Sequence, residues 1–582
     1  MFRILAWAMT ALAALVSQTA YAQARADGPG NAATATAISQ AADACRSLEG
    51  GRFTQMPSAP TWVVKATFNA AKDGRAAFCA IEGYVNPTVN FGLYLPVGNW
   101  NGRFLMRGCG GSCGSVQTEL ACGDHQRAGY ACVFTDMGHR STLSDNNWTA
   151  NNLQGLVDFG YRSTHVTVLA GKAIAKAFYA SDPMKSYYFA CSTGGRQGMV
   201  EVQRFPEDFD GVVAMAPASM GPYGSGGLAG ITALMNLNRD AAGNQILPNR
   251  KALLVHRAVV KDCDLNDGVK DGLIGDPRRC GFKPEDLRCK TTDTSNCLTD
   301  AQVGVVNAFY ARRGASKGSE FNWIGAFIAN ARLPGEPAAA LPDLAQGRGD
   351  PAIVDSLNNP SYPDLRPFEA HGGKLIMVHG WDDPSVMPPP TIDYYETMTR
   401  TMGGPVPTRQ FARLFMIPGM DHCSGGSGAY AIDYMTAITD WVEHDKAPDA
   451  LKGIHPKPGA PLDFFSVRLP QLDPKWIAFS RTHPAYPATG KGGDVPPVVP
   501  AGSLSQELGD AVERADREAT AAFFPRRNVM NAISQAMWQT FYHHDATLAE
   551  QEAALATVKA SRPLTPVATE AVERMKAELA LN

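Results

Sequence analysis

The segment Ala190-Cys-Ser-Thr-Gly-Gly195 places one serine, Ser192, between small residues at the end of an apolar run. A strand that ends in small-x-Ser-x-Gly and leads into a helix is typical of a nucleophile elbow, a tight turn that exposes a reactive hydroxyl. The helix that follows would direct its N-terminal N–H groups toward Ser192 and stabilise an oxyanion. Ala190 replaces the usual first glycine, and a plain Ser/Gly turn is the alternative interpretation.

Two later segments carry the residue types that would activate such a serine. One contains His422 in the sequence Gly-Met-Asp-His-Cys, and the other contains Asp382 and Asp383 in the sequence His-Gly-Trp-Asp-Asp. In α/β-hydrolases the nucleophile, the acid and the histidine follow one another in this order along the chain. We therefore predict Ser192 as the nucleophile, His422 as the general base, and one of the two aspartates as the acid that orients the imidazole.

A glycine-rich segment, Arg107-Gly-Cys-Gly-Gly-Ser112, follows an early apolar run. A loop of this kind can supply the second backbone N–H of an oxyanion hole, beside the N–H of Thr193, which follows the nucleophile. The segment lacks the glycine spacings of the phosphate-binding loops, so it does not predict a phosphate site.

The chain contains 12 cysteines, and an even count in an exported protein predicts disulfides. Proximity in the sequence favours three pairs: Cys45–Cys79, Cys263–Cys280 and Cys289–Cys297. Four cysteines form a cluster with three connectivities open, and irregular spacing argues against zinc there: Cys109, Cys113, Cys122 and Cys132. The last two, Cys191 and Cys423, flank Ser192 and His422, so they lie close enough to bridge if the serine and the histidine meet.

An acidic loop runs from Asp264 to Leu273 and alternates carboxylates with glycines. Carboxylates and carbonyls that can point inward suit a hard cation such as calcium. The loop is not an EF-hand, because its spacing differs and no glutamate closes it. Cys263 and Cys280 would hold its two ends together. An ordinary acidic turn is the alternative interpretation.

Short apolar strands alternate with helical patterns along the chain. The predicted strands are residues 91–97, 103–106, 130–135, 187–190, 211–216, 374–379 and 413–417, and residues 153–179 have helical periodicity. This alternation predicts an α/β fold with a mostly parallel sheet covered on both faces. We expect residues 23–218 and 367–495 to form this core, with residues 219–366 inserted between two core strands as a lid domain.

Both ends of the chain lie outside the predicted core. Residues 1–22 combine Arg3, a short apolar run and an Ala-Tyr-Ala cleavage site, which predicts a signal peptide and a secreted or periplasmic protein. Residues 503–582 follow a Gly/Pro-rich linker and have helical spacing, so we expect a helical extension available for self-association. The net charge of −3 argues against a nucleic-acid partner, and the lack of a later membrane-length apolar run argues against a membrane.

Four motifs together resemble the tannase/feruloyl esterase family, which also includes the hydrolase of mono(2-hydroxyethyl) terephthalate. They are Cys-Ser-Thr-Gly-Gly-Arg-Gln-Gly at 191–198, Phe-Pro-Glu-Asp-Phe-Asp-Gly at 205–211, His-Gly-Trp-Asp-Asp at 379–383 and Pro-Gly-Met-Asp-His-Cys at 418–423. The resemblance covers about residues 45–494. It implies an α/β-hydrolase core with a lid, a structural calcium in the lid, and a disulfide between the neighbours of the catalytic serine and histidine.

The resemblance also implies a role for individual residues. It places the nucleophile on Ser192, the base on His422 and the acid on Asp383, the fifth residue of the His-Gly-x-x-Asp pattern. The oxyanion donors fall on the N–H groups of Thr193 and Gly111. The implied calcium ligands are the carboxylates of Asp264, Asp267 and Asp271 and the carbonyls of Val269 and Leu273. No organic cofactor is expected. Residues 481–486 lack a cysteine that many members carry, and residues 503–582 have no counterpart in the family pattern.

The leading functional hypothesis is hydrolysis of small aromatic esters, such as feruloyl or galloyl esters, through an acyl-enzyme on Ser192. A terephthalate-monoester hydrolase is the alternative within the same reaction class. A non-catalytic binding protein on the same fold is the alternative from a different class, and the intact Ser, Asp and His in the expected order argue against it.

Overall fold

The computed structural model describes residues 35–56, 58–141, 147–218, 238–240, 245–311, 317–320, 357–383, 385–456 and 477–486. The predicted signal peptide (1–22), much of the predicted lid (219–366) and the predicted C-terminal helices (503–582) lie outside these residues. Within the described part, no helix has the length and apolar character needed to cross a membrane.

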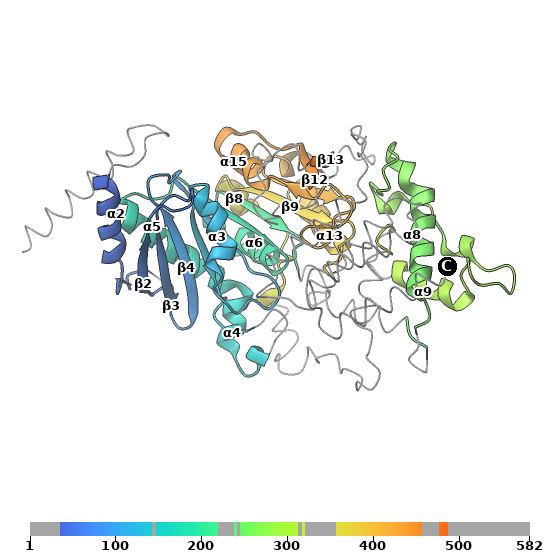
Figure 1. Ribbon diagram of the computed structural model, residues 1–582, viewed down its shortest axis with the longest axis horizontal. Coiled ribbons are helices and arrows are strands. Elements are labelled where there is room, and N and C mark those ends of the chain that lie inside the picture. The colour runs from blue at the N-terminus through green and yellow to red at the C-terminus, as the bar shows by residue number, and fades with distance from the viewer. Residues whose placement is uncertain are drawn as a thin grey trace, which may run out of the picture. The chain divides into compact units, whose positions relative to one another are not determined.

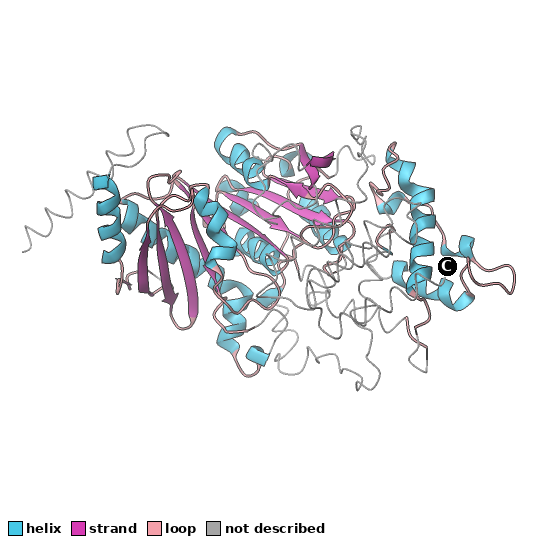
Figure 2. Ribbon diagram, in the orientation of Figure 1, coloured by secondary structure: helices cyan, strands magenta, loops and turns pink. Residues whose placement is uncertain are grey.

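Ten strands form the main sheet, in the order β1-β2-β3-β4-β6-β5-β7-β8-β9-β10 (Figures 1 and 2). Their bounds are β1 Arg52–Phe53, β2 Thr61–Asn69, β3 Phe78–Val85, β4 Val89–Pro96, β5 Arg103–Arg107, β6 Ala131–Thr135, β7 Lys185–Cys191, β8 Gly211–Met215, β9 Lys374–Gly380 and β10 Ala412–Ile417. A second sheet contains β11 Ala431–Ile432, β12 Ala450–Pro456 and β13 Ile477–Pro484. All seven strands predicted from apolar runs are present.

The described helices have the bounds α2 Ala35–Ser47, α3 Thr118–Arg127, α4 Leu153–Val157, α5 Ser163–Tyr179, α6 Thr193–Arg204, α8 Asn249–Cys263, α9 Asp300–Ala311, α12 Arg366–Ala370, α13 Pro388–Thr401, α14 Pro405–Thr408 and α15 Tyr434–His444. The predicted helix 153–179 is interrupted between α4 and α5 by a π-helical turn, Asp158–Arg162. Arg196 on α6 donates hydrogen bonds to the carbonyls of Phe159 and Gly160 in this turn, at 2.6 and 2.8 Å.

The sheet contains the predicted parallel pairs but is antiparallel at its N-terminal end, which includes the predicted strand 91–97, now β4. Strand β5 pairs in parallel with β6 and β7, and β9 pairs in parallel with β10. Strands β1 to β4 pair antiparallel, and β4 joins them antiparallel to β6. We did not predict β2 and β3, because exposed polar residues interrupt their apolar residues and leave no continuous apolar run.

The chain divides into two compact units. The first contains residues 1–214, 345–358 and 365–374. Helices cover both faces of its sheet (Figure 1). On α5, a Cβ atom at Gly171 would lie 3.6 Å from Cβ of Val133, whereas a Cβ at Gly92 would meet Thr118 of α3. Gly92 pairs with Phe134, the neighbour of Val133. Because successive residues of a strand face opposite sides, α3 and α5 cover opposite faces.

The second unit contains residues 215–344, 359–364 and 375–582, so helices α8 and α9 belong with β10 and the small sheet. Within the predicted insertion 219–366, residues 345–358 and 365–366 fall in the first unit. All six residues of β10 are buried, as expected for a strand covered on both faces. Helix α15 begins after Asp433, whose carboxylate accepts a hydrogen bond from the N–H of Thr436 at 2.9 Å.

Candidate active site

Ser192 lies between β7 and α6 with φ of 64° and ψ of −125°, a backbone conformation that non-glycine residues rarely adopt. Such strain at a serine between a strand and a helix is the geometry of a nucleophile elbow. The turn is tight because α6 starts directly against β7. A Cβ atom at Gly194 would lie 2.4 Å from Cβ of Ala190, and one at Gly198 would lie 2.9 Å from the Tyr188 ring. Glycine at 194 therefore makes room for alanine at 190, and glycine at 198 lets α6 pack against the Tyr188 ring.

The two predicted oxyanion donors lie side by side. Thr193 is the first residue of α6, where backbone N–H groups have no acceptor within the helix. Its Oγ1 donates a hydrogen bond to the carbonyl of Gly111 at 2.7 Å. Gly111 has φ of 56° and lies in the short loop closed by the Cys109–Cys113 disulfide. The side chain of Thr193 thus holds the loop that carries Gly111. The N–H groups of these two residues are the predicted oxyanion donors.

The predicted acid and base contact each other. His422 Nδ1 lies 2.6 Å from Asp383 Oδ2. The other oxygen, Oδ1, accepts hydrogen bonds from the N–H groups of Ser385 and Val386, both at 2.8 Å. Asp383 is buried, and burial alone would raise its pKa. The charges and hydrogen bonds of His422 and His379 outweigh burial and lower the pKa, so Asp383 is a carboxylate at any working pH.

The structure separates the two aspartates that the residues alone left equivalent. Asp382 is also buried, but burial raises its pKa well above the usual value, and the charges of Asp421 and Glu320 raise it further. A carboxyl that stays protonated cannot stabilise an imidazolium. The contact with His422 comes from Asp383, the residue on which the family resemblance placed the acid.

A glycine in the His-Gly-Trp-Asp-Asp motif brings the loop of Asp383 against the loop of His422. A Cβ atom at Gly380 would lie 2.1 Å from the carbonyl oxygen of Met420 and 2.7 Å from that of Asp421. The N–H of Asp382 also donates a hydrogen bond to the Met420 carbonyl at 3.1 Å. Only glycine allows this approach, which fixes the distance between acid and base.

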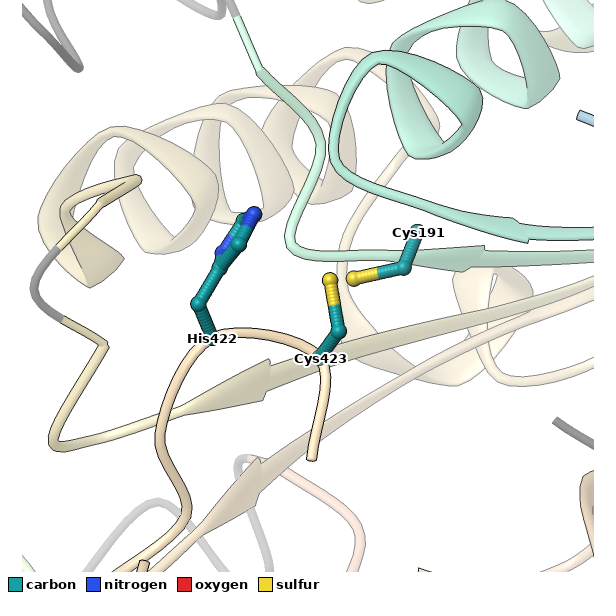
Figure 3. Close-up of side chains that lie close together, drawn as sticks. All are labelled: Cys191, His422 and Cys423. Carbon is teal, nitrogen blue, oxygen red and sulfur yellow. The ribbon is translucent and has the colours of Figure 1, made fainter. Parts of the chain in front are cut away.

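Each catalytic loop carries a disulfide-bonded cysteine. Cys191 comes from the end of β7, whereas Cys423, like His422, comes from the loop after β10 (Figure 3). No cysteine is free among the described residues, which include all twelve. The other ten form the bridges Cys45–Cys79, Cys109–Cys113, Cys122–Cys132, Cys263–Cys280 and Cys289–Cys297. The three expected local pairs are present, and the cluster takes one of its open connectivities, which leaves it no thiolate for zinc.

The acidic loop gathers its three carboxylates by hydrogen bonds to its own backbone. Asp264 Oδ1 accepts from the N–H groups of Asp271 and Gly272, at 3.0 and 2.9 Å. Asp267 Oδ1 accepts from the N–H of Val269 at 3.0 Å, and Asp271 Oδ1 accepts from the N–H of Leu273 at 3.1 Å. These hydrogen bonds fold the loop back on itself and bring its three carboxylates to one side of the backbone.

One residue of this site was missed in the sequence. Arg481 on β13 is buried, and its guanidinium contacts Oδ2 of both Asp267 and Asp271. Burial raises the pKa of Asp271 to about 6, although Arg481 opposes the shift. The charges of Asp267 and Asp264 raise that pKa further, and three carboxylates beside one guanidinium leave two negative charges unbalanced when all three are ionised. This donor set fits a divalent, oxygen-binding cation.

Comparison with known proteins shows the family to which the chain belongs. Residues 74–327 and 348–484, more than half of the chain, match the family described as tannase and feruloyl esterase. Mono(2-hydroxyethyl) terephthalate hydrolase from Piscinibacter sakaiensis is 29% identical over 523 residues, covering 72% of this chain and 86% of that protein. Probable feruloyl esterase B-1 from Aspergillus oryzae is 31% identical over 437 residues, covering 65% and 77%.

Solved structures agree at the level of the fold. The crystal structure of feruloyl esterase B from Aspergillus oryzae aligns with a TM-score of 0.61 and 27% identity, covering 77% of this chain and 96% of that chain. Tannin acyl hydrolase from Aspergillus niger aligns with a TM-score of 0.56. The chain therefore belongs to the tannase and feruloyl esterase family and has an α/β-hydrolase-like fold.

Proposed function

We propose that this carboxylic ester hydrolase is an exported serine esterase of aromatic esters, with Ser192 as nucleophile, His422 as base and Asp383 as acid. The observation that carries the proposal is the 2.6 Å contact between His422 and the ionised Asp383. Ser192, in a strained strand-to-helix turn, supplies the third member of the proposed triad. Export rests on the signal-like residues 1–22, and twelve disulfide-bonded cysteines fit an oxidising compartment.

In the proposed reaction, His422 takes the hydroxyl proton of Ser192 while the serine oxygen attacks the ester carbonyl carbon. The N–H groups of Thr193 and Gly111 stabilise the negative oxygen of the tetrahedral intermediate. This intermediate collapses, and the leaving alcohol takes the proton from His422. A water molecule then loses a proton to His422 and attacks the acyl carbon, which releases the carboxylic acid and returns the proton to Ser192.

Preference for aromatic acyl groups is supported by the relatives and by an aromatic cluster near the donor loop. Two relatives are named for their action on feruloyl and terephthalate esters, both derived from aromatic acids. Beside the loop, His139 lies 2.7 Å from the Ser112 carbonyl and stacks on Trp148 at 3.6 Å between ring centroids. Phe159 packs edge-on against His139. Flat rings of this kind offer stacking partners to an aromatic acid.

A substrate panel tests the proposal. We expect kcat/KM for methyl ferulate or methyl gallate to exceed that for mono(2-hydroxyethyl) terephthalate by at least ~10-fold, since one well-matched contact is worth that much. The reverse order would favour the terephthalate-monoester alternative. A fluorophosphonate probe should label Ser192, as shown by peptide mapping. A protein that takes no label and hydrolyses none of these esters would be the non-catalytic binding protein instead.

We further propose that Cys191 and Cys423 pair with each other and hold the His422 loop against the elbow. Replacing both cysteines by alanine should lower kcat by about 10²-fold with little change in KM, because a misplacement of ~1 Å has that effect. The paired replacement of Cys289 and Cys297 is the matched control and should lower stability without lowering kcat. Peptide mapping under non-reducing conditions should find the link, and a native kcat in the folded double variant would contradict a positioning role.

Calcium is the proposed occupant of the acidic loop, held by Asp264, Asp267 and Asp271 with the carbonyls of Val269 and Leu273. The cation would balance the carboxylate charge that Arg481 does not neutralise. We assign the cation no part in the chemical step. No organic cofactor enters the proposed reaction, which needs only the ester and water.

Removing the cation should lower the melting temperature. A ligand at a hundredfold excess over its Kd stabilises a fold by about 2.7 kcal/mol, so chelation should produce a measurable shift that added calcium reverses. The double replacement Asp264→Asn and Asp267→Asn should abolish the response to chelator. An unchanged melting curve for the native protein, together with no metal by elemental analysis, would rule the site out.

A further inference from the structure

We infer that Gln197 is a positioning residue that holds the oxyanion loop, Gly108 to Gly111, against the nucleophile elbow; the inference rests on the proposed serine mechanism. Gln197 lies in the second turn of α6, five residues after Ser192, and its side chain is buried. Its Oε1 accepts a hydrogen bond from the Tyr188 hydroxyl at 2.9 Å. Its Nε2 is directed at Cys109 Sγ at 3.2 Å and at Met137 Sδ at 2.9 Å.

The acceptors of Nε2 argue against a role in stability alone. Both are sulfur atoms, which accept hydrogen bonds weakly. An amide buried against such acceptors is poorly compensated for its lost hydration, so leucine or methionine would stabilise this position better. The amide instead fixes the position of the loop, because it links Cys109 in the loop to Tyr188 in strand β7.

The loop runs directly over this pair of side chains. A Cβ atom at Gly108 would lie 2.0 Å from the Tyr188 hydroxyl oxygen and 2.5 Å from Gln197 Oε1. The Tyr188 hydroxyl shares its single proton between Gln197 Oε1 and the carbonyl of Gly194, just after the elbow, which lies 2.7 Å away. The same polar pair therefore contacts both the start of the oxyanion loop and the turn that carries the nucleophile.

Helix α6 consequently holds the loop at two points. Gln197 contacts its first half at Cys109, and Thr193 contacts its second half at the Gly111 carbonyl. The Cys109–Cys113 disulfide closes the loop beyond these contacts. The spacing between the N–H groups of Thr193 and Gly111, which must both reach one oxyanion, depends on these two attachments.

Gln197→Met keeps the length and apolar volume of the side chain and removes the amide. We expect kcat to fall ~10- to 100-fold with KM within about twofold, because the oxyanion forms only after substrate is bound. Inhibition by a phenylboronic acid, whose serine adduct resembles the tetrahedral intermediate, should weaken by a similar factor. Gln126→Met is the matched control: Gln126 is also a buried glutamine of this unit, bonded to Arg75 rather than to the loop.

Thr193→Val tests the second attachment of the loop, at Gly111, in an independent variant. It removes the hydroxyl bonded to Gly111 and keeps the shape of the side chain, so we expect the same selective loss of kcat and of boronate affinity. A native kcat and native boronate inhibition in a folded Gln197→Met protein would overturn the inference. Activity that survives Ser192→Ala would instead overturn the serine mechanism, so the two failures are distinguishable.

Discussion

Ser192→Ala should lower kcat on the order of 10⁶-fold while the protein stays folded, the loss typical of a triad nucleophile. The serine is only partly buried at the elbow, and its hydroxyl adds little to packing. Alanine keeps the Cβ that already occupies the left-handed conformation at φ of 64°, so the turn is no more strained than before. The measurement is kcat on the preferred ester together with the melting temperature.

Ser186→Ala is the control for this variant. Ser186 lies on β7, the strand that leads into the elbow, and the same atom is removed without touching the reacting position. It should keep native turnover and fluorophosphonate labelling, whereas Ser192→Ala should lose both. More than a tenth of native activity in the Ser192→Ala variant would contradict the assignment of Ser192 as the nucleophile.

Asp383→Asn has the second-largest expected effect, a loss of kcat on the order of 10⁴-fold by analogy with other triad aspartates. The Oδ1 atom would still accept the N–H groups of Ser385 and Val386. An amide nitrogen would then replace Oδ2 opposite His422 Nδ1. A donor at that position favours the imidazole tautomer that carries its proton on Nε2, which cannot accept the serine proton.

Asp382→Asn separates this effect from general damage to the loop. Burial and the charges of neighbouring carboxylates raise the pKa of Asp382 well above its usual value, which favours the neutral form that an amide resembles. We expect its kcat to stay within a few-fold of native, because a neutral group can be exchanged without changing the charge near His422. The opposite ranking of the two variants would show that the acid is the other neighbour.

The sequence predicted the strands that carry the site because their signal is local. Strands β7, β9 and β10 are buried along almost their whole length and are rich in apolar residues, and the motifs stand at their ends or close after them. The hairpin of β2 and β3 mixes buried and exposed residues, so the same criterion missed it. The interruption at Asp158–Arg162 depends on Arg196 from another helix, which periodicity within one segment cannot reveal.

For the candidate site, too, local sequence signals predicted some features, whereas contacts between distant segments determined the others. The residue types of the triad were visible as motifs, but Asp382 and Asp383 differ only through the folded loop, where two backbone N–H groups and His422 converge on one carboxylate. Gln197 stood inside a recognised motif with no sign of its role, since its partners come from β7 and from two separate loops. Contacts between distant segments decided both cases.

The ion pair between Arg481 and Asp267 joins residues 214 positions apart in the chain. The acidic turn is synthesised long before Arg481. Until β13 has been made and folded, the carboxylates of the turn repel one another without a nearby positive charge. The stability of this turn is thereby tied to β13, and a chain that ended before β13 would leave the carboxylates of Asp267 and Asp271 without their counter-charge.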